Sequence, residues 1–322
     1  MLASPLRTLH QHAEAAMAPY GPPEAGILVV QTYGELELEY AALRKSCVLI
    51  DRPERAILEI TGPDRIDFLN RMLTQDLKTL TPGHLVHAFW LNRKGRIDAD
   101  ITLIHLDGRT YADLDALAAQ RTIEGLSSFI ITEDVSIADA TSRLHRLSLH
   151  GPTASALLPA PSLPAAGAIA PATLADRTAT RATVAGNPVT IYRDDAAGEP
   201  GFEIILNADH ALAVFQHLIE IGHDQHNSDA PELGTPGAGL ALHSHRSAAH
   251  FRLRPAGWHA YNIARIEAGT PLYNIDFGPD SLPHETGDHV LHDRVSFTKG
   301  CYLGQEIVAR MPHACAYRVR AR

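Results

Sequence analysis

Cysteine is scarce in this sequence, and long apolar runs are missing. Three cysteines, Cys47, Cys301 and Cys315, occur in 322 residues, a small and odd number that excludes a disulfide framework and fits a reducing compartment. No stretch approaches the roughly 18 to 20 consecutive apolar residues that cross a bilayer, and the first residues lack the charged-then-apolar layout of a signal peptide. We therefore expect a cytoplasmic protein without a membrane partner, in which any functional cysteine acts as a thiol.

An excess of positive charge and phosphate-binding loops are missing too. The 28 Lys and Arg residues are outnumbered by 37 Asp and Glu residues, which gives a net charge of −9 at pH 7. No overall basic field therefore attracts nucleic acid, and we expect no direct binding to it. No Gly-x-Gly-x-x-Gly follows a strand pattern and no Gly-Lys-Ser/Thr occurs, which disfavours nucleotide hydrolysis.

Composition and apolar spacing predict an α+β protein. Hydrophobic residues make up 45% and charged residues 20%, which is typical of globular proteins, and the length allows about two domains. Apolar residues at helical spacing predict helices over residues 5–18, 115–130 and 210–221, and one after Pro63. Short apolar runs predict strands over residues 47–50, 56–60, 85–91, 97–104, 188–192 and 202–206. Because strands and helices do not alternate regularly, α+β is favoured over a doubly wound sheet.

The strongest local signal is the octapeptide from Lys299 to Glu306. Cys301 follows Lys299 by two residues and precedes a run that reads as a helix, so a cation and a helix dipole would both favour its thiolate. Residue types alone favour an inert, buried Cys301, because free cysteines are among the most buried residues. The octapeptide as a whole changes that balance, since it resembles the signature of the YgfZ family of folate-binding proteins.

Other segments are similar to a relative of that family, the aminomethyltransferase (T-protein) of the glycine cleavage system. They occur in the same order, at residues 44–51, 62–69, 73–77, 82–83, 92–100, 198–203 and 265–271. The resemblance implies two interleaved lobes enclosing a folate pocket, which we place at residues 37–145 and 146–311, after an N-terminal helix and linker over residues 1–36. Residues 312–322 read as a tail without strand alternation, so the family's C-terminal β-barrel lobe is expected to be absent.

Two carboxylates match functional positions of the T-proteins. Asp100 corresponds to the aspartate that lies near the folate nitrogens and assists one-carbon transfer, and a carboxylate is suited to hydrogen-bond a protonated amine. Glu203 corresponds to the glutamate that holds the pterin ring, whose paired N–H donors suit its two oxygens. As single residues, both also fit solvent-facing strand carboxylates. The resemblance favours the pocket for Glu203 and leaves Asp100 evenly balanced.

Four further residues complete the expected site. Asn92, on a turn, and Arg265 are expected near tetrahydrofolate. The guanidinium of Arg265 suits the glutamyl tail of folate, although an ordinary ion pair fits it equally well. Arg265 and Glu267 would diverge on a helix and share one face of an extended segment. Cys301, assisted by Lys299, is expected at the rim of the pocket with a reactive thiol.

Departures from the T-protein pattern bear on activity. They are His87 and Ala196 where the enzymes carry tyrosine, Ala99 where they carry an acidic residue, and Tyr261-Asn262 where they carry an Arg-Asp pair. Losing these features while keeping the pterin-binding glutamate favours a folate-binding protein that is not a glycine-cleavage enzyme.

The YgfZ family is tied to the assembly or repair of iron-sulfur clusters and to the tRNA modification that depends on them. The resemblance therefore implies tetrahydrofolate, or a one-carbon derivative, as cofactor and iron-sulfur client or assembly proteins as partners. Two alternatives stay open. One is a tetrahydrofolate-dependent aminomethyltransferase of glycine cleavage or of the sarcosine or dimethylglycine type. The other is a scaffold that keeps the fold but binds no ligand.

Histidines are concentrated between residues 217 and 259. The spacings in His223-x-x-His226 and His243-x-His245 allow two imidazoles to converge on one ion. No cysteine lies nearby and the spacings match no closed site, so we expect a solvated polar loop and no metal site. A pairing of histidine with Cys301 is too loose a pattern to indicate a Cys-His hydrolase.

Overall fold

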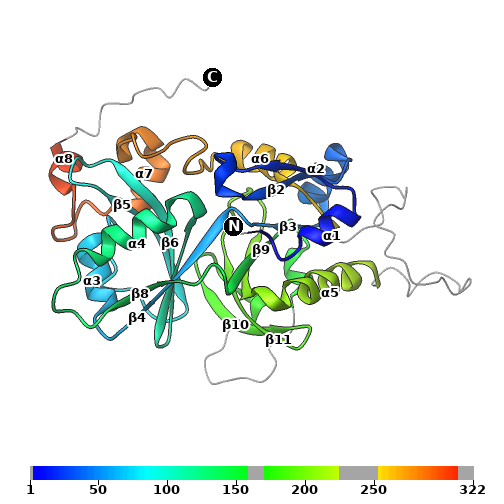
Figure 1. The fold of residues 1–322 in the computed structure, drawn as a ribbon, viewed down its shortest axis with the longest axis horizontal. Coiled ribbons are helices and arrows are strands. Elements are labelled where there is room, and N and C mark those ends of the chain that lie inside the picture. Colours follow the sequence, from blue (N-terminus) through cyan, green and yellow to red (C-terminus); the bar gives the residue numbers. More distant parts are fainter. Residues whose placement is uncertain (1–2, 159–169, 225–252, 311–322) are drawn as a thin grey trace, which may run out of the picture. The chain divides into compact units, whose positions relative to one another are not determined.

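The computed structural model describes residues 3–158, 170–224 and 253–310, whose contacts divide them into two compact units (Figure 1). The first unit comprises residues 1–53, 143–176 and 180–269, and the second comprises residues 54–142, 177–179 and 270–322. Each unit therefore collects separate stretches of the chain. The expected lobe boundaries divide the chain into consecutive pieces and remain a prediction, and the expected tail lies outside the described residues.

The first unit is built on a six-stranded sheet with the order β10-β11-β12-β9-β3-β13. Its strands are β3 (Val48–Asp51), β9 (Leu144–His150), β10 (Ala179–Val184), β11 (Asn187–Arg193), β12 (Gly201–Asn207) and β13 (Arg254–Pro255). Neighbours from β11 to β3 are antiparallel, whereas β13 runs parallel to β3. A separate antiparallel pair joins β1 (Ala16–Pro19) to β2 (Leu28–Thr32).

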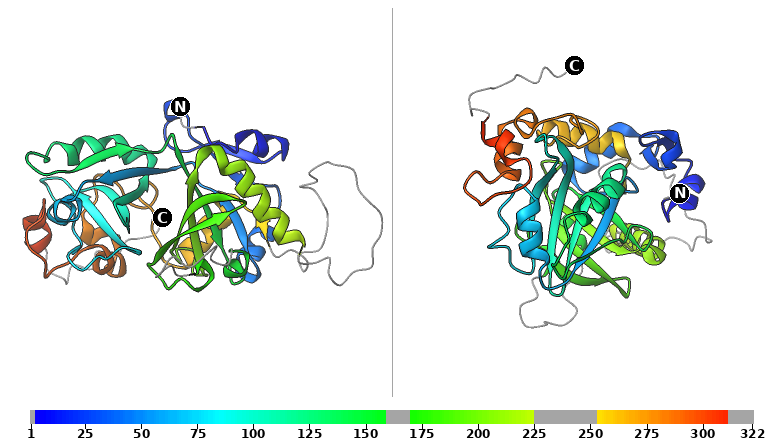
Figure 2. Two further views of the ribbon diagram at one scale, coloured as in Figure 1. Left: turned by 90° about the horizontal axis from the view of Figure 1, so that it is seen from below. Right: turned by 60° about the vertical axis from the view of Figure 1, so that its left-hand side comes forward.

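Helices pack on this sheet because successive side chains of its strands point to opposite faces, so that a strand can present an apolar face. The helices of the unit are α1 (Arg7–His12), α2 (Leu36–Lys45), α5 (Ala211–Asp224) and α6 (Trp258–Glu267), with 3₁₀ turns η1 (Pro23–Ala25), η3 (Ala154–Leu157), η4 (Pro171–Thr173) and η5 (Ala208–His210). Leu147 and Leu149 of β9 share a core with Val214 and Leu218 of α5, which lies along the sheet (Figure 2). The intervening residues of β9 face the opposite side, because successive side chains of a strand alternate.

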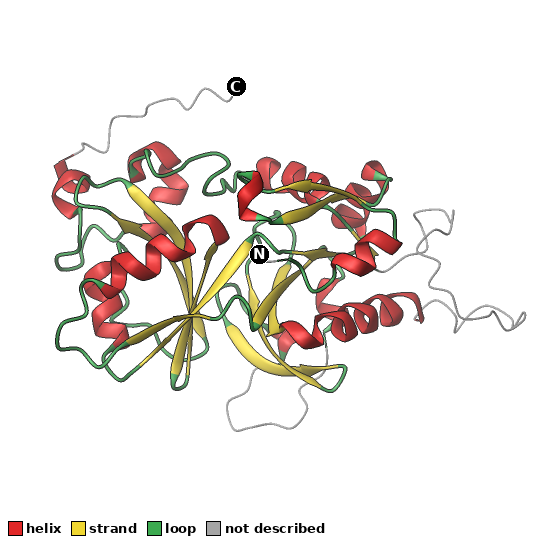
Figure 3. Ribbon diagram, viewed as in Figure 1, coloured by secondary structure: helices red, strands yellow, loops and turns green. Residues whose placement is uncertain are grey.

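The second unit is built on a five-stranded antiparallel sheet with the order β5-β6-β7-β4-β8 (Figure 3). Its strands are β4 (Arg55–Thr61), β5 (His84–Leu91), β6 (Ile97–Leu106), β7 (Arg109–Asp115) and β8 (Ser136–Asp139). Its helices are α3 (Arg65–Met72), α4 (Ala119–Ser127), α7 (Asp288–Arg294) and α8 (Gln305–Arg310), with 3₁₀ turns η2 (Ala116–Ala118) and η8 (Pro283–Thr286).

The β5–β6 hairpin sets the position of Asp100. Its register places Asp100 opposite Phe89. Ala99 and Ile101 belong to the apolar core, so Asp100 points to the other side of the sheet. Gly95, with a φ of 72°, supplies the left-handed turn conformation that the hairpin requires.

Most of the expected elements are present. The α+β class is confirmed, as are the hairpin over 85–104, the strands over 188–192 and 202–206, and the helix after Pro63. The strands over 47–50 and 56–60 also form, but they belong to different sheets. None of the helices in the part of the chain that the structure describes is long and apolar enough to cross a membrane.

The first helix is shorter than expected. It ends at His12, and Ala16–Pro19 forms β1 instead of a further helical turn. Glu14 has a φ of 53°, a left-handed conformation that an α-helix cannot contain, so the chain turns there into the strand. The stretch over residues 156–175 is rich in alanine and proline, which predicts an exposed connector, and residues 159–169 of it lie outside the described residues.

Candidate functional site

Glu203 lies inside the first unit, on β12. Its side chain is fully buried, which excludes the alternative of a solvent-facing carboxylate. Arg146 on the neighbouring strand β9 donates from Nε to Glu203 Oε2 over 2.7 Å. The hydroxyl of Ser148, also on β9, donates to the same oxygen. One of the two carboxylate oxygens therefore already accepts two hydrogen bonds.

The other oxygen of Glu203 has a different environment. Oε1 is buried and receives no hydrogen bond from the residues that the structure describes. His150 Nε2 lies 3.3 Å away, but neither ring nitrogen of His150 forms a hydrogen bond within the described chain. Burial alone would raise the pKa of Glu203, but the charges of Arg146 and His150 outweigh it and hold that pKa well below its usual range. Glu203 is thus an ionised carboxylate whose Oε1 has an ion-pair contact with His150 but receives no hydrogen bond from the described residues.

An aromatic ring and a second guanidinium adjoin this cluster. The ring centroid of Tyr261 lies 5.4 Å from that of His150, and the guanidinium of Arg52 lies 4.3 Å from the Tyr261 ring centroid. Arg52 also donates to the Ser148 hydroxyl over 3.3 Å. Tyr261 therefore contributes an aromatic face that the Arg52 cation covers.

Arg265 lies on α6 and is almost completely buried. Its Nε donates to Asn262 Oδ1 over 2.8 Å. Glu267, two residues further on, instead pairs with Arg44 and accepts a 2.6 Å hydrogen bond from the Tyr40 hydroxyl. The segment is helical and the two side chains diverge, which decides between the two arrangements that the sequence allowed.

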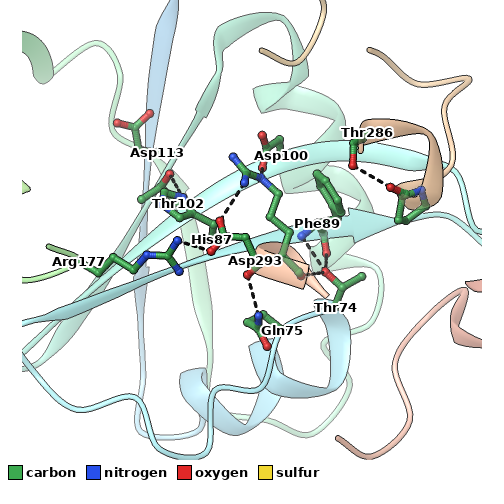
Figure 4. Close-up of polar contacts among 12 residues, drawn as sticks. Thr74, Gln75, His87, Phe89, Asp100, Thr102, Asp113, Arg177, Thr286 and Asp293 are labelled. Atoms are coloured by element: carbon green, nitrogen blue, oxygen red, sulfur yellow. Dashed lines mark hydrogen bonds and ion pairs between the residues drawn. The ribbon is translucent and has the colours of Figure 1, made fainter. Parts of the chain in front are cut away.

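Asp100, on β6 of the second unit, is paired with a cation. Arg294, the last residue of α7, donates from Nε to Asp100 Oδ1 over 2.7 Å, and its guanidinium lies 2.9 Å from the carboxylate of Asp293. Asp293 pairs in turn with Arg177, and its backbone carbonyl accepts a 2.7 Å hydrogen bond from Gln75 (Figure 4). Two carboxylates and two guanidinium groups therefore alternate in one chain of ion pairs.

His87 lies beside this chain of ion pairs, on β5 (Figure 4). It is buried, and its Nδ1 is 3.0 Å from the hydroxyl of Thr102. Burial lowers the pKa of His87 to about 4, and the positive charge of Arg294 acts in the same direction. The imidazole is therefore neutral at physiological pH. His87 thus supplies a neutral ring that can form hydrogen bonds beside the ion pairs.

The hairpin turn itself uses the side chain of Asn92. Its Oδ1 accepts hydrogen bonds from the backbone N–H groups of Lys94 at 2.9 Å and Arg96 at 3.2 Å. Its Nδ2 donates to Asp98 over 3.1 Å. These bonds give Asn92 a structural role, and its contact with a ligand remains a prediction.

Lys299 and Cys301 differ sharply in environment. Lys299 is buried, and its ammonium group donates to the backbone carbonyls of Asn70 at 2.6 Å, Leu73 at 2.8 Å and Gln75 at 2.7 Å. Burial lowers the pKa of Lys299 to about 8. Cys301 is exposed and lies in a non-helical stretch, four residues before the start of α8. Its expected position at a helix mouth is wrong, and a helix dipole weakens beyond the terminal turn.

The expected site residues are distributed over both units. The first unit holds Glu203 and Arg265, and the second holds Asn92, Asp100, Lys299 and Cys301. Within the second unit, the loop over residues 73–75 contacts both Lys299 and Arg294. It therefore links the surroundings of Asp100 to the segment that carries the cysteine.

Sequence reasoning missed the partners of both carboxylates. On β9, Arg146, Ser148 and His150 alternate with two leucines, a period of two that places three polar side chains on one strand face and could have been read as a polar site. Arg294 leaves no such pattern, because it meets Asp100 only through the tertiary fold.

A metal site finds no support among the described residues, where no group of three or more His, Cys, Asp or Glu side chains could hold an ion. His217 and His259 lie on α5 and α6. The other members of the histidine-rich stretch have side chains outside the described part of the chain; they are His223, His226, His243, His245 and His250.

Known proteins share this fold and sequence pattern. The family model described as GCVT N-terminal domain matches residues 9–230. An aminomethyltransferase of Symbiobacterium thermophilum is 26% identical over 321 residues, which cover 96% of this chain and 74% of that protein. An aminomethyltransferase of Caldanaerobacter subterraneus subsp. tengcongensis is 24% identical over 273 residues, which cover 84% of this chain and 64% of that protein. This chain thus matches less than two thirds of the length of the second relative.

A solved structure supports the same comparison. The crystal structure of the glycine cleavage system aminomethyltransferase T from Bartonella henselae matches with a TM-score of 0.68 and 23% sequence identity, and the match covers 89% of this chain and 70% of that one. At this identity, the likeness shows the fold.

Proposed function

This chain belongs to the GCVT N-terminal domain family, within the T-protein superfamily, and from that premise we propose that it is a folate-binding protein of the YgfZ type. In this proposal, tetrahydrofolate or a one-carbon derivative binds beside Glu203, and the protein supports the assembly or repair of iron-sulfur clusters in the cytoplasm. Its partners are iron-sulfur client or assembly proteins, and tRNA modification depends on it through them.

The observation that carries the proposal is Glu203 Oε1, which receives no hydrogen bond from the described residues and has only an ion-pair contact with His150 at 3.3 Å. A buried carboxylate oxygen without a donor is costly, by about 1 to 3 kcal/mol or more for a charged group. A ligand that presents an N–H group to Oε1 removes this cost, and the amino-pyrimidine edge of a pterin carries such groups. Because Oε2 already accepts from Arg146 and Ser148, the ligand meets one open oxygen of the carboxylate. In this proposal an N–H group of the pterin ring therefore meets the Oε1 side of Glu203.

The charge around Asp100 favours binding over transfer. A protonated one-carbon intermediate gains most from a carboxylate whose charge is uncompensated. Here the guanidinium of Arg294 already neutralises Asp100, and the alternating ion pairs with Asp293 and Arg177 leave the cluster without net charge. This arrangement supports a protein that binds folate without the glycine-cleavage reaction.

The exposed thiol of Cys301 supports the iron-sulfur part of the proposal, because an accessible thiol can reach a partner protein or a cluster. Complementation of a strain that lacks the protein tests this part. A Cys301→Ala variant should fail to restore iron-sulfur enzyme activity, whereas alanine at the buried Cys47 should restore it. Full activity with Cys301→Ala would remove the thiol from the proposal.

A tetrahydrofolate-dependent one-carbon enzyme is the second candidate, and the retained Asp100 and the aminomethyltransferase relatives favour it. Purified protein given tetrahydrofolate and an aminomethylated donor would then release methylene-tetrahydrofolate. The YgfZ-type proposal expects no turnover in this assay but saturable heat when tetrahydrofolate is titrated into the protein. A scaffold without a ligand would give neither.

A further inference from the structure

Lys299 is buried and binds the backbone of a loop in its own unit. Its ammonium group donates to three backbone carbonyls, those of Asn70, Leu73 and Gln75, at 2.6, 2.8 and 2.7 Å. An ammonium group has three N–H donors, so these bonds use all of them. With its pKa near 8, the group is still mainly protonated at pH 7 and can make all three.

Two of these carbonyls lie at the C-terminal end of α3. The helix ends at Met72, so the carbonyl of Asn70 is among those that have no partner within the helix. A lysine ammonium satisfies such carbonyls and interacts favourably with the negative end of the helix dipole. The loop that leaves α3 therefore depends on Lys299, a residue far away in the sequence.

The same loop is bound by the segment that precedes Lys299. The N–H of Ser296 donates to the Thr74 carbonyl over 3.0 Å. The Thr74 hydroxyl donates to the carbonyl of Arg294 over 2.6 Å, and Gln75 donates to the carbonyl of Asp293 over 2.7 Å. The carbonyls of residues 73, 74 and 75 are thus all bound by residues 296–299.

We infer that Lys299 is a positioning residue, which fixes the segment over residues 293–301 on the 73–75 loop and so sets the place of the Cys301 thiol relative to the Asp100–Arg294 pair. Lys299 takes no part in the chemistry of the thiol, because all three of its donors are directed to backbone carbonyls. The inference deepens the proposed function and rests on it only for the importance of Cys301, since the contacts themselves involve neither folate nor an iron-sulfur cluster.

The rate of Cys301 alkylation by iodoacetamide tests this role. It is followed by mass spectrometry of the peptide that contains Cys301 and is measured from pH 6 to pH 10, approximately the range over which thiols titrate. In Lys299→Met, loss of hydrogen bonds to a charged group should release the segment and raise the limiting rate at high pH about tenfold. The midpoint of the pH profile should stay where it is in the wild type. Lys94→Met, at the exposed hairpin turn, is the matched control and should leave both unchanged.

Lys299→Arg separates position from charge. Its planar guanidinium keeps the positive charge but does not reproduce the tetrahedral arrangement of donors around three carbonyls, so the limiting rate should again rise. An upward shift of the midpoint in Lys299→Met, with wild-type behaviour in Lys299→Arg, would mean that Lys299 acts on the thiol by its charge, and it would overturn the inference. Unchanged profiles in both variants would overturn it as well. Neither outcome bears on folate binding, so failure of the inference and failure of the proposed function can be told apart.

Discussion

Arg294 Nε donates a 2.7 Å hydrogen bond to Asp100 Oδ1, so the carboxylate of Asp100 is already paired with a cation. The pair is mostly buried, with 12% of the Arg294 side chain and 14% of the Asp100 side chain exposed. A second carboxylate, that of Asp293, holds the same guanidinium. A ligand that needs the charge of Asp100 must therefore compete with an arginine that is fixed at two points.

The strength of this pair can be measured with a double-mutant cycle. Arg294→Met, Asp100→Asn and the double variant should give a coupling energy of about 2 kcal/mol in urea unfolding, because the hydrogen bond joins two charged, mostly buried groups. The more exposed Arg71–Glu133 pair is the control and should give a clearly smaller coupling energy, because solvent screens it. Equal coupling energies in the two cycles would show that the Asp100–Arg294 pair is no stronger than an exposed ion pair.

His87 should make stability depend on pH between about 4 and 6.5. Its pKa in the folded protein is about 4, against about 6.5 in an unfolded chain. In this window the unfolded state binds the proton and the folded state does not, so the free energy of unfolding rises with pH. From pH 7 to pH 4 the loss attributable to His87 should reach up to about 3 kcal/mol. Urea unfolding of His87→Gln at several pH values should lack this loss, whereas the exposed His84→Gln should retain it.

The carboxylate of Asp51, in the first unit, should make stability depend on pH in a more acidic range. The buried carboxylate of Asp51 lies 2.6 Å from His145 Nε2 and 2.9 Å from His10 Nε2, and Ser4 donates to it as well. Burial alone would raise the pKa of Asp51, but the two histidines outweigh it and lower that pKa below its usual range. The stabilisation is therefore complete above the ordinary aspartate pKa of about 3.9 and is lost as pH falls through the lower, folded-state value.

Asp51→Asn should consequently lower the free energy of unfolding at pH 7 by about 3 kcal/mol, since it weakens several buried hydrogen bonds to a charged carboxylate. The difference from wild type should shrink once the pH falls below about 4. Urea unfolding at pH 7 and at pH 3 measures both quantities, with the exposed Asp209→Asn as control. A difference that is constant over this range would show that the carboxylate charge of Asp51 does not stabilise the fold.

The sequence was most informative where chemistry and local pattern coincide. The hairpin that carries Asp100 has alternating strands and a glycine turn, and both are found as expected. Its place in a motif predicts a site role for Glu203, and the structure adds that Arg146 donates to one of its oxygens. Such partners come from neighbouring strands whose order in the sheet, β12 beside β9, no local pattern encodes.

Other features were missed because the competing local signals are weak. Apolar residues continue at helical spacing past His12, but Glu14 adopts a left-handed conformation and the chain continues as β1. The sequence predicts an electrostatic role for Lys299, because it lies two positions before Cys301. Its donors instead reach carbonyls that lie more than 200 positions away, a tertiary relationship that spacing along the chain does not reveal.

Recognition of folate by Glu203 is the central claim, and a matched pair of variants can test it. In Glu203→Gln, the amide oxygen can take the place of Oε2 and keep the bonds from Arg146 and Ser148. The NH₂ group then takes the place of Oε1. This group would face the N–H of the ligand as a second donor. Glu199→Gln changes a nearby, partly exposed glutamate that contacts Arg44 at 3.4 Å, and it controls for the loss of a negative charge.

Calorimetric titration with tetrahydrofolate is the most direct measurement. Wild type and Glu199→Gln should bind with the same affinity. Glu203→Gln should bind at least about tenfold more weakly, the effect expected when a hydrogen bond to a buried charged group is lost. Saturable binding with the same dissociation constant in Glu203→Gln and in wild type would contradict the account, as would the absence of any saturable heat in the wild type.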